Sequence, residues 1–269
     1  MAEGKFRVAA VQMVSEPEVQ ANLAVAGELI AQAAGEGARL VALPEYFCLL
    51  GLRDRDKVNV RETDGHGPIQ DFLAAAAARN KVWLVGGSAP LECADPDKVR
   101  NSCLVFDDSG RRVARYDKIH LFGFDLGTER FQESRSIEPG SEVVTLETPF
   151  ARLGLSICYD LRFPEMYRKM GAVDLILIPS SFTATTGKAH WEMLLRARAV
   201  ENQAYVLAPA QGGHHKNGRY TWGHSMIIDP WGEVLAVLES GPGVVSAELD
   251  HAEIARVRLV LPALTHRVM

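Results

Sequence analysis

The segment LGLSICYDLRFPEMYRKM, residues 153–170, joins a strand pattern to a helix pattern through a short polar turn. Residues 153–157 are small or apolar and predict a buried strand that ends at Cys158. A helix pattern follows Pro164 and covers residues 165–170. A buried strand that leads directly into a helix is typical of a β-α-β unit, so this stretch indicates an α/β fold.

The same alternation continues on both sides of this segment. In the second half we predict strands at 175–179 and 205–208, a helix at 191–202, and a hairpin with strands 225–228 and 233–238. In the first half we predict strands at 6–13, 38–43 and 82–86, helices at 19–34 and 70–79, and a hairpin with strands 102–106 and 112–116. Each half therefore combines β-α-β units with an antiparallel hairpin, which favours two packed mixed sheets covered by helices. No linker rich in Pro, Gly or Ser divides the halves, so we expect residues 1–269 to form a single domain.

Composition and charge exclude several classes of protein. The chain has 34 acidic and 29 basic residues and a net charge of -5, which does not favour binding to nucleic acid or to an anionic membrane surface. No run approaches the roughly 18 apolar residues of a membrane helix, and the N-terminal residues lack the apolar run of a signal peptide. The four cysteines form no CxxC pair, so we expect free thiols in a reducing cytoplasm.

Three reactive side chains, Glu45, Lys118 and Cys158, lie just beyond predicted strands. In α/β folds, ligands collect at the carboxyl ends of strands. A cysteine is most often a buried core thiol, but Cys158 precedes a polar turn that enters a helix, where the helix dipole would favour its thiolate. Glu45 lies between two apolar runs, and its burial would raise the pKa of the carboxyl toward that of a general base. Nothing beside Lys118 separates a surface lysine from a fixed positive charge.

Four motifs resemble those of the nitrilase superfamily of carbon–nitrogen hydrolases: LPEY (43–46), YDKIHLF (116–122), FQES (131–134) and CYDLRFPE (158–165). The resemblance covers nearly the whole chain. It implies a four-layer α-β-β-α sandwich of two mixed sheets, and a catalytic set of Glu45, Lys118 and Cys158 with Glu133 as a second active-site glutamate. It implies no cofactor, and the histidines show no HExxH metal motif.

The resemblance also implies a mechanism for cleaving a small carboxamide to an acid and ammonia. Glu45 would take the proton of Cys158, and the thiolate would attack the amide carbon to form a thioester. Lys118 and the backbone N–H of Tyr159 would bind the developing oxyanion. Glu133 would orient Lys118 or the substrate amide. His120 is the alternative base, as in Cys-His proteases, but the family pattern does not use it.

The C-terminal half indicates which amide is cleaved. The segments at 187–211 and 222–236 resemble the Nit branch, which contains deaminated glutathione amidase and ω-amidase, an enzyme that acts on α-ketoglutaramate. GGHH (212–215) resembles the former more closely, whereas FQES suits the latter at least as well. We therefore expect an amidase like the former, with an ω-amidase or an inactive binding protein of the same fold as alternatives.

Residues near the predicted strand ends are candidates for binding the substrate. Because the loop at 180–183 follows a buried strand as Cys158 does, we expect it to line the site, and the predicted substrate-binding residues are Tyr159, Phe182, Ser180 and His190. Substrates of this branch carry a carboxylate, for which the candidate partners are Arg162, Lys188, His190, His214 and Arg219. Asp160 and Arg162 are expected to brace the loop that carries Cys158. The mixed apolar and charged surface of the 191–202 helix suits a wet subunit interface, and family members form dimers, so we expect a homodimer.

Overall fold

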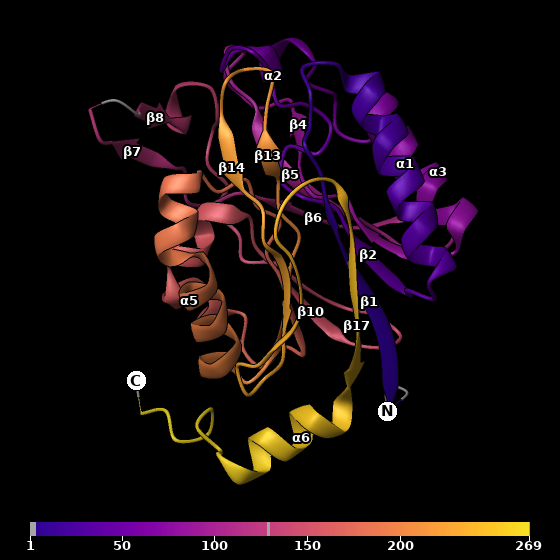
Figure 1. The fold of residues 1–269 in the computed structure, drawn as a ribbon, viewed down its shortest axis with the longest axis vertical. Coiled ribbons are helices and arrows are strands. Elements are labelled where there is room, and N and C mark those ends of the chain that lie inside the picture. The colour runs from indigo at the N-terminus through magenta and orange to yellow at the C-terminus, as the bar shows by residue number, and fades with distance from the viewer. Residues whose placement is uncertain (1–3, 128–129, 269) are drawn as a thin grey trace.

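Two β-sheets pack face to face, and each carries helices on its outer side (Figure 1). This computed structural model describes residues 4–127 and 130–268. The first sheet contains, in spatial order, β17 (Gly243–Asp250), β1 (Lys5–Gln12), β2 (Leu40–Ala42), β3 (Trp83–Val85), β5 (Arg100–Phe106) and β4 (Ala89–Leu91), with β6 (Arg112–Asp117) also paired to β5. The second contains β16 (Val234–Leu238), β15 (Ser225–Ile228), β12 (Tyr205–Ala208), β11 (Leu175–Leu177), β10 (Arg152–Leu155) and β9 (Thr145–Glu147).

Each sheet has a parallel centre and antiparallel edges. Strands β1, β2 and β3 are parallel, as are β10, β11 and β12. Helices α1 (Val19–Gly35) and α3 (Pro68–Asn80) cover the first sheet. Helix α5 (Ala184–Asn202) covers the second, and α4 (Pro164–Lys169) packs against α5. The expected four-layer α-β-β-α sandwich is therefore confirmed.

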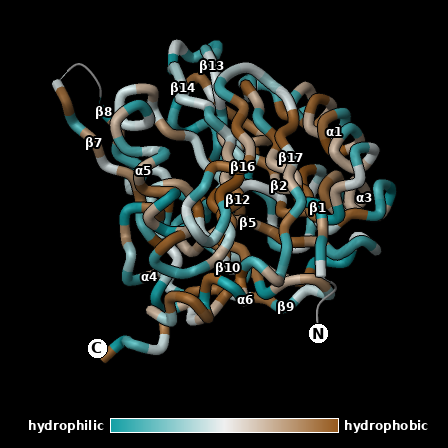
Figure 2. The backbone as a smooth tube through the Cα atoms, turned by 60° about the horizontal axis from the view of Figure 1, so that its bottom comes forward, coloured by the Kyte–Doolittle hydropathy of each residue, from teal (hydrophilic) through white to brown (hydrophobic). Residues whose placement is uncertain are grey.

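The alternation of residues along β1 explains how the layers hold together. Val8 and Ala10 point into the core that both sheets share, whereas Ala9 and Val11 pack beneath α1 and α3. Successive side chains of a strand point to opposite faces, so a strand that is apolar throughout is buried on both sides. Figure 2 shows this as hydrophobic colour along the central strands and hydrophilic colour on many outer loops.

The remaining elements lie at the ends and edges of the sandwich. They are α2 (Asp56–Asn59), α6 (His251–Val260), the 3-10 helices η1 (Glu133–Arg135) and η2 (Cys158–Arg162), and the hairpins β7 (Gly123–Asp125) with β8 (Arg130–Gln132) and β13 (Gly212–His214) with β14 (Tyr220–Trp222). None of these hairpins was expected from the sequence. In the part of the chain that the structure describes, no helix has both the length and the apolar character needed to cross a membrane.

Helix α5 and strand β17 also differ from the sequence prediction. Helix α5 begins at Ala184 rather than at residue 191, because the hydroxyl of Thr183 accepts a hydrogen bond from the Thr186 N–H and caps the helix. Strand β17 was not predicted, although it pairs with β1 along the full length of both strands. The two strands lie at opposite ends of the sequence, so no short-range pattern reports their pairing.

Candidate active site

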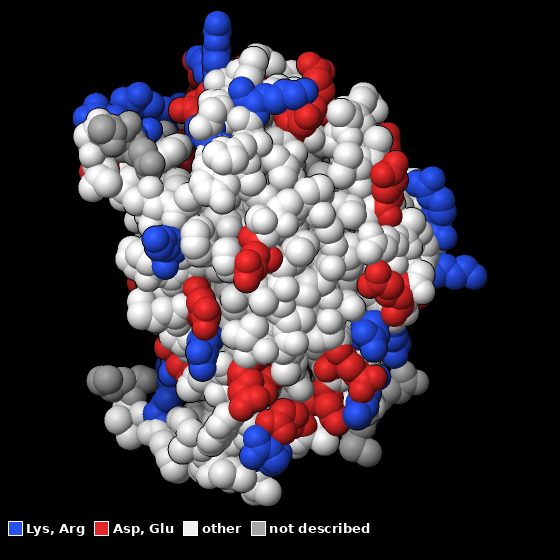
Figure 3. Space-filling model, viewed as in Figure 1, with Lys and Arg blue, Asp and Glu red and all other residues white. Residues whose placement is uncertain are grey.

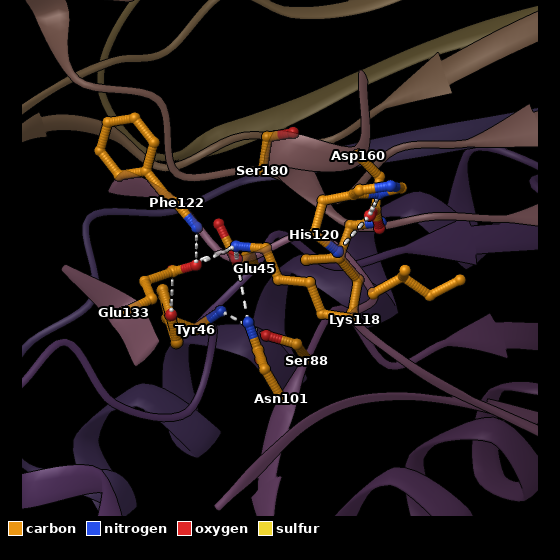
Figure 4. A network of polar contacts seen from close by, with 12 residues as sticks. Glu45, Tyr46, Ser88, Asn101, Lys118, His120, Phe122, Glu133, Asp160 and Ser180 are labelled. Carbon is orange, nitrogen blue, oxygen red and sulfur yellow. Dashed lines mark hydrogen bonds and ion pairs between the residues drawn. The ribbon is translucent and has the colours of Figure 1, made fainter. Parts of the chain in front are cut away.

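The side chains of Glu45, Lys118 and Glu133 meet at one end of the sheets (Figure 4). Glu45 follows β2, Lys118 follows β6, and Glu133 is the first residue of η1. Cys158 follows β10 and lines the same cavity as both glutamates. The four residues expected to form the catalytic set are thus brought together from segments far apart in the sequence.

Lys118 is the centre of this cluster. Its side chain is 0% exposed, and its Nζ lies 2.8 Å from Glu45 Oε1 and 2.8 Å from Glu133 Oε2. Burial disfavours the ammonium form, but the charges of Glu133 and Glu45 outweigh it and raise the pKa of Lys118 well above its usual value. The site therefore contains a fixed positive charge held between two carboxyl groups.

Glu45 has the properties of a general base. Its Oε1 accepts hydrogen bonds from Lys118 and, at 3.0 Å, from Nδ2 of Asn101. Burial raises the pKa of Glu45, and this effect prevails over Lys118 and over a hydrogen bond from the Cys158 thiol, both of which lower it. A carboxyl with a raised pKa can take up and return a proton nearer to neutral pH.

Glu133 has the opposite character. Its carboxylate accepts hydrogen bonds from the Phe122 N–H and the Tyr46 hydroxyl, each 2.7 Å long, as well as from Lys118. Burial alone would raise its pKa, but Lys118, the Phe122 N–H and the nearby Lys57 charge lower the pKa of Glu133 below its usual value. Two glutamates whose pKa values are displaced in opposite directions are suited to different roles, one exchanging a proton and the other staying ionised.

Cys158 occupies a strained turn at the end of its strand. Its φ of 50° lies in the left-handed region that residues other than glycine rarely adopt, and its N–H donates to Pro179 O at 2.9 Å. The side chain is buried, with 7% of the residue exposed. Strain of this kind is common at catalytic turns, because the surrounding structure must hold the residue in place.

Our expectation that a helix dipole lowers the pKa of this thiol is wrong. The residues after Cys158 form the five-residue 3-10 helix η2 rather than the start of an α-helix. Burial and the neighbouring Glu45 charge raise the pKa of Cys158 well above its usual value, although Lys118 opposes them. The thiol is therefore protonated at neutral pH, so a base is needed to make it a nucleophile.

Asp160 braces the loop that carries Cys158. The residue is 0% exposed, and its carboxylate accepts hydrogen bonds from the N–H groups of Ile157 and His120 and from the Tyr116 hydroxyl, at 2.9, 3.0 and 2.5 Å. His120 Nδ1 lies 2.7 Å from the same carboxylate (Figure 4), and its ring stacks on Phe163. Asp160 thus ties the nucleophile turn to the segment after Lys118, and His120 belongs to this brace rather than to the cavity wall.

Replacing Asp160 with asparagine should both destabilise the protein and slow the reaction. An amide would present an NH2 group to at least one of these donors, and a buried polar group left unsatisfied costs about 1–3 kcal/mol, more when a charge is involved. Urea unfolding and kcat would measure the two effects. Asp97→Asn is the matched control. Asp97 is 69% exposed and pairs with the exposed Arg55, so this change should alter stability by less than about 1 kcal/mol. An Asp160→Asn protein with wild-type stability and kcat would contradict the bracing role.

A cavity of about 530 Å³ opens beside the thiol. Its wall combines the reactive residues with polar, aromatic and cationic side chains. Besides Glu45, Glu133 and Cys158 it is lined by Tyr46, Asp54, Lys57, Phe122, Arg130, Phe131, Gln132, Ser181, Thr183, Ala184, Asn217, Gly218, Arg219, Tyr220 and Thr221. This size and mixture suit a small polar organic molecule.

The four predicted substrate-binding residues are placed differently. Tyr159 and Phe182 line a small side pocket next to Cys158. Ser180 does not reach the cavity, because it is 0% exposed and its hydroxyl donates to Ile178 O, and the neighbouring Ser181 lines the cavity instead. His190 also lies outside it, in a surface depression along α5, where its Nδ1 is 3.3 Å from Arg162.

The cationic candidates are similarly divided. Arg219 lines the main cavity and Arg162 lines the side pocket, whereas Lys188 and His214 are exposed outside both. Lys57, in α2, lines the main cavity and was not expected from the sequence. The four residues before it are charged, although Val58 and Val60 follow it, and this mixture does not distinguish it from a surface lysine.

The sequence matches the model of a known protein family. The family model described as carbon-nitrogen hydrolase matches residues 7–259. The chain belongs to the carbon–nitrogen hydrolase family. The chain is accordingly a hydrolase that acts on carbon–nitrogen bonds other than peptide bonds.

Individual members of the carbon–nitrogen hydrolase family are similar over the full length of the chain. A deaminated glutathione amidase of Synechocystis is 41% identical over 98% of this chain and 98% of the relative. An omega-amidase, NIT2, of Xenopus tropicalis is 40% identical over 96% of this chain and 93% of the relative. The crystal structure of Saccharomyces cerevisiae Nit3, a member of branch 10 of the nitrilase superfamily, superposes with a TM-score of 0.89 at 31% identity, covering 100% of this chain and 98% of that one.

Proposed function

We propose that this enzyme hydrolyses the amide of deaminated glutathione or a closely similar small carboxamide through a thioester on Cys158. The observation that carries the proposal is the buried contact of Lys118 with Glu45 and Glu133, beside a protonated thiol at the end of a cavity. These groups supply a base, a fixed positive charge and a nucleophile.

Glu45 is the proposed base in the first half of the reaction. Its carboxylate takes the proton from Cys158 as the sulfur bonds to the amide carbon, and the carbonyl oxygen becomes an oxyanion. The Lys118 ammonium has three N–H donors and contacts one oxygen of Glu45 and both oxygens of Glu133. One N–H would turn from the Glu133 carboxylate to this oxyanion, which the Tyr159 N–H also binds. Glu45 then returns its proton to the leaving nitrogen, the C–N bond breaks, and a thioester remains.

Water completes the cycle by the same route. Glu45 removes a proton from a water molecule as its oxygen attacks the thioester carbon. The C–S bond breaks, the acid is released, and the sulfur recovers a proton from Glu45. Glu133 stays ionised through both halves and keeps the Lys118 ammonium charged and aimed at the oxyanion. This is the role that its lowered pKa supports.

The size of the cavity favours deaminated glutathione over the smaller α-ketoglutaramate. A volume of about 530 Å³ lies within the usual range for sites that enclose drug-sized ligands and exceeds what a five-carbon acid amide fills. The relatives do not separate the two substrates, because the deaminated glutathione amidase and the omega-amidase are equally similar to this chain.

A direct comparison of kcat/KM tests the substrate. Chromatography would follow the disappearance of each substrate. We expect kcat/KM for deaminated glutathione to be at least about tenfold higher than for α-ketoglutaramate, a difference of about 1.4 kcal/mol. A clear preference for α-ketoglutaramate would make the enzyme an ω-amidase. Cys158→Ala is the control and should remove both activities. An inactive binding protein, our other alternative, would turn over neither substrate.

We also propose that the chain acts as a homodimer in the cytoplasm. The support for a dimer is the exposed apolar side chains of α5 and of the β15–β16 hairpin, where Met193 is 62%, Trp231 48% and Val237 44% exposed. Exposed apolar side chains that adjoin one another mark an interaction surface. The support for a cytoplasmic location is four cysteines that are all free, as expected under reducing conditions.

A further inference from the structure

The cavity holds a cationic group that the proposed mechanism does not use. Lys57 lines its wall, with its Nζ 5.4 Å from the centre of the Tyr46 ring and 3.4 Å from the Ser136 hydroxyl. Within residues 4–127 and 130–268, Lys57 forms no ion pair with a carboxylate. Burial lowers the pKa of Lys57, because the nearby carboxylates do not fully replace the hydration that the ammonium group loses on burial.

The other cations of the cavity wall are already neutralised. Arg219 binds Asp54 at 2.9 Å and lies over the Phe131 ring. Arg130 pairs with Asp125 and is 68% exposed. Figure 3 shows Lys and Arg side chains gathered at the end of the molecule where β7 and β8 lie, with acidic side chains nearby. Among the described residues of the cavity wall, Lys57 therefore differs from Arg219 and Arg130 in having no carboxylate within ion-pair distance.

The charge balance on the two sides of Tyr46 shows where an anion fits. The Tyr46 hydroxyl donates to Glu133, which holds Lys118, whereas the ring of Tyr46 lies against Lys57. On the first side two carboxyl groups surround one ammonium, so a third anion would be repelled there. On the Lys57 side an ammonium faces the cavity. Glu133 and Asp54 act on it without an ion-pair contact and do not offset its burial, and Asp54 is itself bound to Arg219, so an anion would be attracted there.

We propose that the Lys57 ammonium binds a carboxylate at the end of the substrate remote from the scissile amide. The enzyme then selects ω-carboxamides that carry a distal carboxylate over neutral amides of the same length. This inference rests on the proposed function, because it places the amide at Cys158. Arg162 is the rival cation, but it lies between the Tyr159 and Phe182 rings at a side pocket of about 10 Å³, which is no larger than a single water molecule requires.

Matched substrates and variants test this assignment. Glutaramate carries a carboxylate, and glutaramide is its neutral counterpart of the same length. Lys57→Met keeps the shape and removes the charge. We expect it to lower kcat/KM for glutaramate about 10- to 100-fold, mainly through KM, the range for losing a charged hydrogen bond. Turnover of glutaramide should change by less than about threefold, and Lys57→Arg should recover part of the glutaramate activity.

Control variants separate this role from a structural one. Lys5→Met removes an exposed lysine that is paired with Glu248 at the start of β1, and it should leave both substrates unaffected. Replacing an unpaired, partly buried charge by an apolar side chain should not unfold the protein, and a thermal melt checks this. An equal loss for glutaramate and glutaramide, no loss for either, or a selective loss in Arg162→Met instead of Lys57→Met would overturn the proposal.

A binding measurement on an inactive variant tests the Lys57 assignment without depending on the proposed reaction. In a Cys158→Ala background, calorimetry with glutarate, the dicarboxylate product analogue, should show at least about tenfold weaker binding when Lys57→Met is added. An unchanged Kd would overturn the Lys57 assignment even if the wild-type enzyme hydrolyses amides. A Kd that depends on Lys57 in an enzyme that hydrolyses no amide would instead contradict the proposed function alone.

Discussion

Glu45→Gln should lower kcat/KM for the amide substrate by about 100- to 10,000-fold, the usual contribution of a general base. The effect should be at the upper end of that range, because burial raises the pKa of Cys158 and leaves almost no thiolate without a base. Glutamine keeps the size of the side chain and the hydrogen bond to Asn101, so the protein should remain folded. The loss would be measured at saturating and limiting substrate, as amine released from deaminated glutathione or as ammonia released from α-ketoglutaramate.

The pH dependence of wild-type activity also tests whether Glu45 is the general base. Glu45 must be ionised to act as a base, so activity should rise with pH as its carboxyl loses its proton. Because burial raises the pKa of Glu45, the midpoint of this acid limb should lie above the ordinary range of a glutamate. The limb should be missing from the residual activity of Glu45→Gln.

His120→Ala provides the control for the identity of the base. His120 is held by Asp160 and Phe163 and is not part of the cavity wall, so this variant should retain measurable turnover. An inactive His120→Ala enzyme together with an active Glu45→Gln enzyme would reverse the assignment and make the histidine the base.

Lys118→Met should lower both the rate of turnover and the free energy of unfolding. The loss of an oxyanion donor raises the barrier by about 2.7–4 kcal/mol. The same change leaves Glu45 and Glu133 buried without their cation, and breaking a buried ion pair by removing one partner costs about 3–5 kcal/mol of folding free energy. Urea unfolding and kcat of the purified variant would measure the two losses separately.

A double variant separates the structural part from the catalytic part. Adding Glu133→Gln to Lys118→Met removes one of the two uncompensated carboxylates, so stability should partly recover while turnover stays lost. Lys5→Met is the matched control, since an exposed lysine ion pair contributes little to stability. A Lys118→Met protein as stable as wild type would show that the cluster is not held together by this ammonium.

The parts of the fold that could be predicted depend on short-range patterns. The apolar run at 153–157, the amphipathic helix at 19–34 and the hairpin at 102–116 each carry a repeat that a few neighbouring residues reveal. The position of Glu45 and Cys158 just beyond buried strands was visible for the same reason. Strand β17 and the β13–β14 hairpin could not be predicted this way, because their partners lie elsewhere in the chain or their strands are too short to show a repeat.

The sequence could not predict which individual residues face the cavity. Ser180 and Ser181 are adjacent and identical, yet the first is buried against Ile178 and the second faces the cavity. Side chains of an extended segment alternate between its two faces, so a boundary error of one residue exchanges them. Lys57 was missed for a different reason, since a lysine that follows four charged residues carries no clear local sign of burial.

The sequence by itself determined the class of fold, the family motifs and the three reactive residue types at strand ends. The tertiary structure alone decided how those residues differ in proton affinity. Glu45 and Glu133 are the same amino acid, and Lys118 touches both, but one pKa rises and the other falls. A pKa depends on burial and on charges and donors brought close by the fold, such as the Phe122 N–H and the Tyr46 hydroxyl, which no local stretch of sequence contains.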